Sequence, residues 1–328
     1  MALTTIDSAS TAAVRAQVAR SIEGRRTDVR GRLFELALVL CLLVSLAILA
    51  LLLIDVWGDG AGVYPQRGQN FLQNGLSSDP VKAGIAQGLI GSFWIAVCVV
   101  VVALPLGVGA AIYLEEYAPR NRLTSFIEVN VRNLAGVPSV VYGLLGLAVF
   151  VEVFNGFSGN DGIGTRTLLA GGLTLAVLVL PIMIITTAEA IRAVPQALRE
   201  GAYGVGATRW EVIRTQVLPY ALPGILTGAL LSIARAVGEA APLILVGALT
   251  GLAGQSPGLS VSSLLDPSSL TERFTAMPNV ITSWAKQPDP LFNTTDTAAA
   301  IIGMLVFVLL VNSIAIVLRN RFEKKRSS

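Results

Sequence analysis

Residues Arg199–Pro223 read REGAYGVGATRWEVIRTQVLPYALP and lie between two segments that are apolar enough to cross a bilayer. No other charged run in such a position is as long. Gly206 stands within the run, and glycine adopts backbone angles that other residues resist. We therefore expect two short helices that meet at a sharp angle at Gly206 and form a bent, charged hook able to fill a groove. The alternative is an ordinary solvated loop, because most charged runs are no more than that.

Outside this stretch the chain has the composition of a membrane protein. Hydrophobic residues make up 53% of it and charged residues 14%, which is too apolar for a soluble domain of this size. About 20 apolar residues are needed to cross the hydrocarbon core. The segments that qualify are Phe34–Val56, Leu89–Leu114, Leu134–Phe154, Leu168–Ala190, Leu222–Leu249 and Ala298–Leu318. The sequence therefore predicts an all-α integral membrane protein with six transmembrane helices.

The distribution of positive charge predicts which connections face the cytoplasm. Lys and Arg are enriched in cytoplasmic connections. With six spans both termini share one side, and 18 of the 24 Lys and Arg residues fall on that side, against five on the other. We therefore expect the N and C termini, together with the run Arg199–Pro223, to be cytoplasmic. The remaining cation, Arg235, lies inside a predicted span.

Several chemistries are excluded by residue types and motifs that the sequence lacks. It contains no histidine, which excludes Ser-His-Asp nucleophiles and His-ligated metals. Cys41 and Cys98 lie inside apolar spans, where a small hydrophobe is the simpler explanation, so we expect neither a disulfide nor a metal site. No Gly-x-x-x-x-Gly-Lys-Ser/Thr phosphate loop is present. We expect a chain that is not an enzyme and needs no cofactor, with any ATPase on a separate subunit.

A charged pair interrupts the predicted fifth span. Arg235 and Glu239 are four residues apart, which places them on one helix face where guanidinium and carboxylate can pair. A charge near the bilayer midplane costs at least ~2.5 kcal/mol on insertion scales, so such residues normally face a water-filled path or a partner. Pro242 is expected to kink the helix just beyond. Gly224 and Gly228 offer a surface for close helix packing.

The hook also carries a recognisable motif. Glu200, Gly201, Ala202, Gly206, Leu218 and Pro219 fall at the spacing of the EAA loop, E-A-A-x-x-x-G followed after a gap by L-P. The run therefore resembles the cytoplasmic loop by which ABC importer permeases dock onto their ATPase subunit. Gly201 stands where that family usually has Ala, and Gln216 stands where it usually has an aliphatic residue.

Two further segments resemble phosphate permeases. The segment Arg235–Leu243, RAVGEAAPL, is similar to the R-A-x-G-E-x-A-P-L signature of PstA-type phosphate permeases, whereas the sister permease usually lacks the Ala-Pro-Leu ending. The segment Gly136–Gly143, GVPSVVYG, also resembles phosphate-importer permeases. Ser139 and Tyr142 are three residues apart on one helix face and are candidates to line a polar path, although bonds to neighbouring helices would explain them equally well.

The resemblance implies a type I ABC importer permease fold in the bacterial plasma membrane, with inorganic phosphate as the cargo. It implies as partners a second, PstC-type permease subunit, a PstB-type ATPase dimer inside, a PstS-type phosphate-binding protein outside and membrane lipid, and no nucleic acid. Arg235 and Glu239 would be the charges of the path, and Glu200 with Gly206 the core of the ATPase-coupling loop. In this hypothesis Arg235 offsets the cost of an oxyanion in the membrane, and Glu239 neutralises Arg235 when no anion is present.

The expected domain organisation has five parts. They are a cytoplasmic tail at 1–33, the first span and a periplasmic connection at 34–88, a permease core at 89–249 with the coupling loop at 199–219, a periplasmic loop at 250–297, and the last span with a basic tail at 298–328. A loop as long as 250–297 is usually functional or disordered, and we expect part of it to meet an extracytoplasmic binding protein.

Alternative functions remain at this stage. An ABC permease for sulfate, molybdate or phosphonate fits the apolar spans equally well. A proton- or sodium-coupled carrier would need intramembrane carboxylates, of which Glu239 is the only clear one, and it would give the EAA-like loop no purpose. A membrane enzyme is disfavoured by the missing histidine and the lack of a clustered nucleophile and base.

Overall fold

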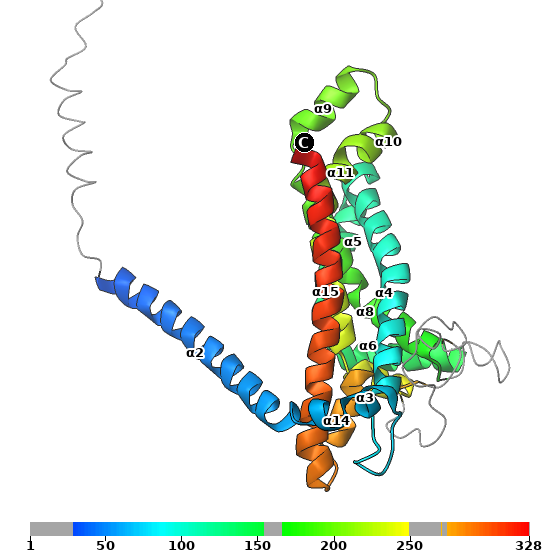
Figure 1. Cartoon of the computed structure of the whole chain (residues 1–328). Coiled ribbons are helices and arrows are strands. Elements are labelled where there is room, and N and C mark those ends of the chain that lie inside the picture. Colours follow the sequence, from blue (N-terminus) through cyan, green and yellow to red (C-terminus); the bar gives the residue numbers. More distant parts are fainter. Residues whose placement is uncertain (1–28, 154–165, 249–269, 271–273, 328) are drawn as a thin grey trace, which may run out of the picture. The chain divides into compact units, whose positions relative to one another are not determined.

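The computed structural model describes residues 29–153, 166–248, 270 and 274–327, which are almost entirely helical (Figure 1). The chain forms two compact units, Met1–Asp55 and Val56–Ser328. The α-helices are α2 (Val29–Gly60), α3 (Val63–Gln73), α4 (Ala86–Ile112), α5 (Arg122–Ala135), α6 (Ser139–Gly146), α8 (Leu168–Arg192), α9 (Gln196–Gly204), α10 (Arg209–Val212), α11 (Leu218–Gly238), α12 (Ala241–Val246), α14 (Met277–Trp284) and α15 (Thr297–Ser327). The π-helical segments are η1 (Tyr113–Tyr117), η2 (Leu147–Val153), η4 (Ile213–Val217) and η6 (Leu291–Asp296).

The described part of the first unit, residues 29–55, is the body of α2. Every residue in it is exposed, and apolar side chains lie on all sides of the helix. A helix of this kind is stable in a membrane or in a packed interior, not in water. At 1.5 Å per residue the 32 residues of α2 extend over about 48 Å, more than the roughly 30 Å of a hydrocarbon core. The first predicted span is therefore confirmed as a helix long enough to cross.

In the second unit α8 is the central helix. It packs against α4, α5, α6 and α11, and most of its residues are buried. Its neighbour α11 packs in turn against α4 and α15. Figure 1 shows these long helices running beside one another, with α9 and α10 at one end and α3 and α14 at the other. The arrangement separates the hook from the connections at the opposite end.

Glycines bring α11 close to α8. A Cβ atom added to Gly224 would lie 2.7 Å from Cβ of Ala190, and one added to Gly228 would overlap the side chain of Thr186. Close approach through small residues is the usual way in which helices pack inside membranes, where lipid is as apolar as the helices themselves. The predicted packing surface at these two glycines is therefore confirmed.

The predicted third span, Leu134–Phe154, is not one helix. After α5 ends at Ala135 the chain turns, and α6 leaves at an angle of 101° to it. Pro138 precedes α6, and a proline both lacks an N–H group and disfavours helical angles at the residue before it. The hydroxyl of Tyr142 donates to the carbonyl of Leu134 across the turn at 2.8 Å. The helix of this span therefore begins at Ser139 and not at Leu134, because Pro138 separates it from α5.

The predicted fifth span, Leu222–Leu249, also differs from the structure. Its helix begins earlier, since α10, η4 and α11 form one continuous span candidate from Arg209 to Gly238. Glu239 then adopts extended angles (φ −86°, ψ 116°), and α12 starts a new helix. The expected kink at Pro242 is wrong, because the helix ends at Gly238, four residues before it. Pro242 instead occupies the first turn of α12, where its missing N–H is no loss.

The predicted periplasmic loop at 250–297 is helical in its second half. Residues 249–269 and 271–273 lie outside the described residues. Beyond them α14 packs against α4 and α15, and Trp284 of α14 lies between Phe71 of α3 and Phe292 of η6, with ring centroids 6.2 and 5.5 Å away. Buried aromatic rings in contact make a stable cluster. Residues 274–297 are therefore part of the packed core and not a free loop.

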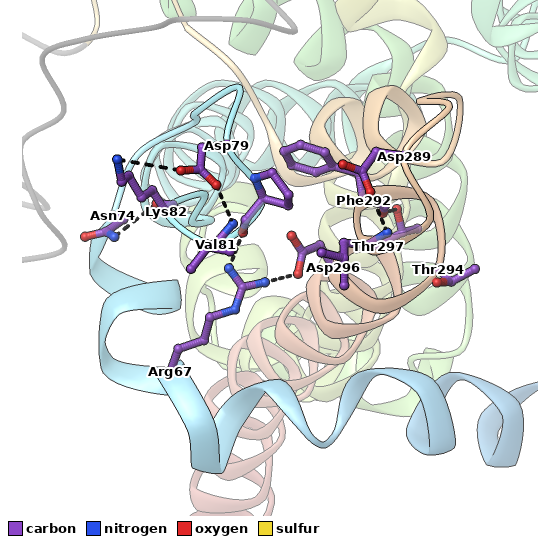
Figure 2. Close-up of polar contacts among 12 residues, drawn as sticks. Arg67, Asn74, Asp79, Val81, Lys82, Asp289, Phe292, Thr294, Asp296 and Thr297 are labelled. Carbon is purple, nitrogen blue, oxygen red and sulfur yellow. Dashed lines mark hydrogen bonds and ion pairs between the residues drawn. The ribbon is translucent and has the colours of Figure 1, made fainter.

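A polar network ties the same elements together (Figure 2). Arg67 of α3 donates to the carbonyl of Pro80 and forms an ion pair with Asp296 at the end of η6. The Asp296 side chain is completely buried, whereas Arg67 is 20% exposed. Tyr64 of α3 donates to the carbonyl of Ala299 in α15 at 2.7 Å. Two connections that are far apart in sequence thus close over the same end of the second unit.

Within the described residues, five helices are long and apolar enough to cross a membrane, and the bent pair α5 and α6 raises the number to six if it counts as one span. This agrees with the six predicted spans. The cytoplasmic location of the termini stays a prediction, and residues 1–28 of the expected N-terminal tail lie outside the described residues.

Candidate functional site

The hook folds as two helical arms with Gly206 between them. Gly206 has φ of +86°, a left-handed angle that glycine adopts without strain. The arm before it is α9 and the arm after it is α10. Thr208 caps α10, since its hydroxyl accepts from the backbone N–H of Glu211 while the Glu211 carboxylate accepts from the backbone N–H of Thr208 at 2.7 Å. This capping box explains why a helix starts at Arg209, three residues after the glycine.

The residues of the EAA-like motif divide into exposed and packed positions. Glu200, Gly201 and Gly206 are exposed, while Ala202 and Leu218 are partly buried against the core around α8 and α11. Next to the glycine, Val205 is 85% exposed, and Tyr203 and Trp210 are 45% and 53% exposed. The hook thus exposes apolar side chains around Gly206, and it also exposes the carboxylate of Glu200 on α9. This surface is expected to be cytoplasmic.

Pro219 is accommodated by a local widening of the helix. The N–H of Leu218 donates to the carbonyl of Ile213, five residues back, which makes Ile213–Val217 a π-helix. A proline inside a regular α-helix removes one hydrogen bond and clashes with the preceding turn. Widening the turn before Pro219 relieves that crowding, so the Leu-Pro end of the motif marks the point where the hook joins α11.

Sequence reasoning missed the residues that anchor the hook to the span before it. Arg199 of α9 pairs with Glu116 of η1, with its Nη2 atom 3.0 Å from Oε1. It also donates to the carbonyls of Ile191 and Val194 at 2.9 and 2.7 Å. The Arg199 and Glu116 side chains are only 14% and 9% exposed. The sequence did carry one sign of these contacts. A Glu-Glu pair follows the predicted span Leu89–Leu114, and arginines follow the predicted span Leu168–Ala190 on the same expected side of the membrane.

Two further contacts reach the same segment. Arg192, in the last turn of α8, pairs with Glu115 of η1 at 2.6 Å and approaches Glu128 of α5 at 3.6 Å. The guanidinium carbon of Arg209 lies 5.0 Å from the ring centroid of Tyr117. Cations in the last turn of a helix also interact favourably with its carbonyl end. The hook, η1 and the end of α8 therefore form one charged cluster.

The predicted path charges pair as expected. Nε of Arg235, in the last turn of α11, lies 3.5 Å from Oε1 of Glu239, the first residue after that helix. Their side chains are 44% and 22% exposed, so the pair lies at the surface of this chain and not inside its core. A charge on a membrane-spanning face normally meets a partner or water, because lipid contact is costly.

The two segments that resemble phosphate permeases meet in space. α6 packs against α12, and a Cβ atom added to Gly143 would lie 2.7 Å from Cα of Pro242. Tyr142 is buried, and its hydroxyl donates to the carbonyl of Leu134. Ser139 is half-buried at the start of α6. The hydroxyl bond of Tyr142 to Leu134 matches the alternative of a contact between neighbouring helices.

Comparison with known proteins places these features in a family. The family model "Binding-protein-dependent transport system inner membrane component" matches residues 103–328. The chain is 38% identical over 180 residues to the probable ABC transporter permease protein YqgI of Bacillus subtilis (strain 168), covering 55% of this chain and 58% of that protein. It is 40% identical over 176 residues to the phosphate transport system permease protein PstA of Mycobacterium leprae (strain TN), covering 53% and 54%.

A third relative extends the aligned region. The chain is 30% identical over 266 residues to the phosphate transport system permease protein PstC of Xylella fastidiosa (strain Temecula1 / ATCC 700964), covering 75% of this chain and 81% of that protein. The matches to YqgI and PstA, in contrast, span little more than half of the length of those relatives.

A solved structure has the same fold. It is a bacterial alginate ABC transporter in complex with an alginate pentasaccharide-bound periplasmic protein, with a TM-score of 0.60 and 15% identity, covering 90% of this chain and 96% of that one. The predicted ABC importer permease fold is therefore confirmed. The chain is a multi-pass inner-membrane permease component and is not itself an ATPase. With its family model matched over more than half of its length, the chain belongs to the inner membrane components of binding-protein-dependent transport systems, the permease subunits of ABC importers.

Proposed function

We propose that this permease imports inorganic phosphate and is the PstA-type subunit of a phosphate ABC importer. The observation that carries the proposal is the Arg235–Glu239 pair, which lies at the surface of the chain at the end of α11. Its sequence setting, RAVGEAAPL, resembles the PstA-type signature, and the packing of α6 on α12 supports a joint role for the two resembling segments. Relatives named as phosphate permeases, both PstA and PstC, support the cargo.

In this proposal Arg235 and Glu239 lie on the path between this chain and a second permease subunit. The guanidinium of Arg235 attracts the oxyanion and offsets its desolvation cost in the membrane. Glu239 holds the guanidinium when no anion is present, so the path carries no free charge at rest. Ser139 and Tyr142 are assigned to the same path, because both belong to α6, which packs against α12 directly after the charged pair.

The hook, residues 199–219, docks onto an ATPase dimer in the cytoplasm. Its tip supports this role because Val205 and Trp210 are exposed apolar side chains on a polar surface, and exposed apolar patches mark protein contacts. Glu200, which is also exposed on the hook, supplies a charge that helps to align the hook with the ATPase. The remaining partners are a PstC-type permease and an extracytoplasmic phosphate-binding protein.

The test is ATP-dependent uptake of labelled phosphate into vesicles that contain this chain with its ATPase, its second permease and its binding protein. Uptake that requires ATP and persists in excess sulfate supports the proposal. Uptake abolished by sulfate assigns the permease to another oxyanion. Uptake that follows a proton or sodium gradient without ATP overturns the coupling role of the hook.

A further inference from the structure

Three consecutive residues of η1 each contact an arginine from a different element. Glu115 pairs with Arg192 of α8 at 2.6 Å, and Glu116 pairs with Arg199 of α9 at 3.0 Å. The guanidinium of Arg209 in α10 lies 5.0 Å from the ring centroid of Tyr117. One short segment at the end of α4 therefore contacts the end of α8 and both arms of the hook.

The π-helical geometry of η1 makes this arrangement possible. The N–H of Ala118 donates to the carbonyl of Tyr113, five residues back, at 2.8 Å. Consecutive side chains on a helix point about 100° apart, or somewhat less where the turn is widened. Three consecutive residues therefore face three directions, and η1 presents each to a different neighbour. π-helical turns of this kind are rare and often occur at functional sites.

The Glu116–Arg199 contact is the strongest of the three. Both side chains are largely buried, at 9% and 14% exposed. The other donors of Arg199 are occupied by the carbonyls of Ile191 and Val194, so the guanidinium has four hydrogen bonds and no freedom to turn. Separating the pair would leave an unpaired buried charge, which is a severe penalty. α9 is therefore held firmly on η1.

We propose that Glu116 and Tyr117 are positioning residues that make the hook and the cytoplasmic end of α4 move as one body. The inference rests on the proposed docking of the hook onto an ATPase. Each arm of the hook has its own contact, α9 through Arg199 and α10 through Arg209, on either side of the exposed tip at Gly206. A displacement of the tip reaches η1 through both arms. Since η1 continues into α4 without a break, the displacement passes along α4 to the helices packed on it, α8 and α11.

The experiment uses the complete transporter, reconstituted with its ATPase, second permease and binding protein. The variants are Glu116→Gln, which removes the buried charge pair, and Tyr117→Leu, which removes the ring under Arg209. The matched controls are Glu189→Gln, an exposed carboxylate on α8, and Tyr113→Leu, an exposed tyrosine of the same π-helix. The measurements are basal ATP hydrolysis, recovery of the assembled complex, and phosphate transported per ATP hydrolysed.

Gln at position 116 keeps an oxygen that can accept from Arg199, and Arg199 keeps its bonds to the carbonyls of Ile191 and Val194. We therefore expect basal hydrolysis and assembly within twofold of the unmodified protein for both variants. Phosphate transported per ATP falls about tenfold in Glu116→Gln, within the range of typical coupling between sites. It falls about threefold in Tyr117→Leu, which loses only a partly exposed cation–π contact. Both controls stay within twofold. Equal loss in a variant and its control would overturn the inference. If Glu116→Gln does not assemble, Tyr117→Leu decides, because its ring is 40% exposed and its loss leaves no buried charge.

A distance measurement tests the rigid connection directly. Spin labels are placed at Ala197 on α9 and at Val101 on α4, both exposed and outside the tip at Gly206, after Cys41 and Cys98 are changed to Ala. In the unmodified background the distance distribution stays narrow and unchanged on addition of ATP, and it broadens in Glu116→Gln. A distribution that shifts with ATP before any η1 residue is changed would show that hook and helix move separately, and would overturn the inference.

The two proposals fail in different ways. If the unmodified complex hydrolyses ATP and moves no phosphate, the proposed cargo is wrong. The label distances still report on the connection between the hook and α4 in that case. A complex that moves phosphate normally in Glu116→Gln and Tyr117→Leu contradicts the positioning role and leaves the cargo intact.

Discussion

Arg235 and Glu239 pair across the end of a helix. The guanidinium belongs to the last turn of α11, and the carboxylate belongs to the first residue beyond it, where the backbone is extended, yet Nε and Oε1 are 3.5 Å apart. The pair therefore spans the joint between α11 and α12. A movement of one helix relative to the other changes the distance between the two charges, which gives the proposed path a means of exposing Arg235.

Replacing Arg235 by Gln is expected to reduce phosphate uptake by about 10- to 100-fold. A hydrogen bond to a charged group contributes roughly 1.5–3 kcal/mol, and each 1.4 kcal/mol is a factor of ten. Assembly and stimulated ATP hydrolysis should persist, because the Arg235 side chain is 44% exposed and is not needed to fill the core. The measurement is uptake into vesicles at equal amounts of assembled complex.

The control for this change is Arg122→Gln, which removes an exposed cation at the start of α5 and should leave uptake unchanged. Normal uptake by an assembled Arg235→Gln complex would show that the path role is wrong. Loss of assembly would instead favour the alternative, in which the pair only holds helices together.

Much of the fold follows from local properties of the sequence. Apolar length predicts the spans, since a helix must satisfy its own backbone groups in lipid, and Gly224 and Gly228 mark the contact of α11 with α8. The helix breaks were harder to place. Pro242 was visible, but a proline can stand in the first turn of a helix or within one, and only the surrounding packing decides which.

The candidate site was predictable where a motif has its own geometry. Gly206 can adopt the left-handed angle that it has in the structure without strain, so a bend of the hook at this residue could be expected from the sequence. The contacts of η1 could not, because Glu116 and Arg199 are 83 residues apart and meet only through the packing of α4 on α8. Position in the sequence carries no information about which of several arginines a glutamate will meet.

Replacing Gly206 by Ala is expected to distort the hook. The φ angle of +86° costs an L-residue roughly 1–2 kcal/mol, which the chain relieves by changing the angle between α9 and α10. Recovery of the ATPase with this chain should fall several-fold in pull-down measurements. Gly201→Ala is the matched control, since Gly201 is helical with open space around it and should be neutral. Equal recovery of the ATPase with both variants would mean that its binding does not depend on the angle between α9 and α10.

Replacing Gly143 by Ala should destabilise the contact between α6 and α12. The new Cβ atom would lie 2.7 Å from Cα of Pro242 and 2.8 Å from Cδ1 of Leu245, which forces the helices apart. Overpacking of this kind costs about 1–3 kcal/mol. The measurement is the thermal unfolding midpoint of the purified complex. Gly109→Ala in α4, with nothing within 4 Å, should leave the midpoint unchanged or raise it slightly, and a similar loss in both variants would contradict the packing argument.

Replacing Tyr64 by Phe tests the hydrogen bond that joins α3 to α15. Its hydroxyl donates to the carbonyl of Ala299 at 2.7 Å, and burial raises the pKa of Tyr64 from its ordinary 10.0 to about 12. The loss of one hydrogen bond should lower the free energy of unfolding by about 1 kcal/mol at neutral pH. The raised pKa also predicts a pH dependence. Below pH 10 the phenol is neutral in both the folded and unfolded states, so its contribution is complete.

Between about pH 10 and 12 the unfolded chain ionises at this position before the folded chain does, so stability falls as the pH rises. Tyr64→Phe should remove this part of the decline, and the difference in unfolding midpoint between variant and unmodified protein should therefore shrink at high pH. Tyr113→Phe, at an exposed tyrosine of η1, serves as the control at neutral pH and should not change the midpoint there. A constant difference across the alkaline range would mean that the Tyr64 hydroxyl is not shielded from water in the folded protein, which would contradict the burial that ties α3 to α15.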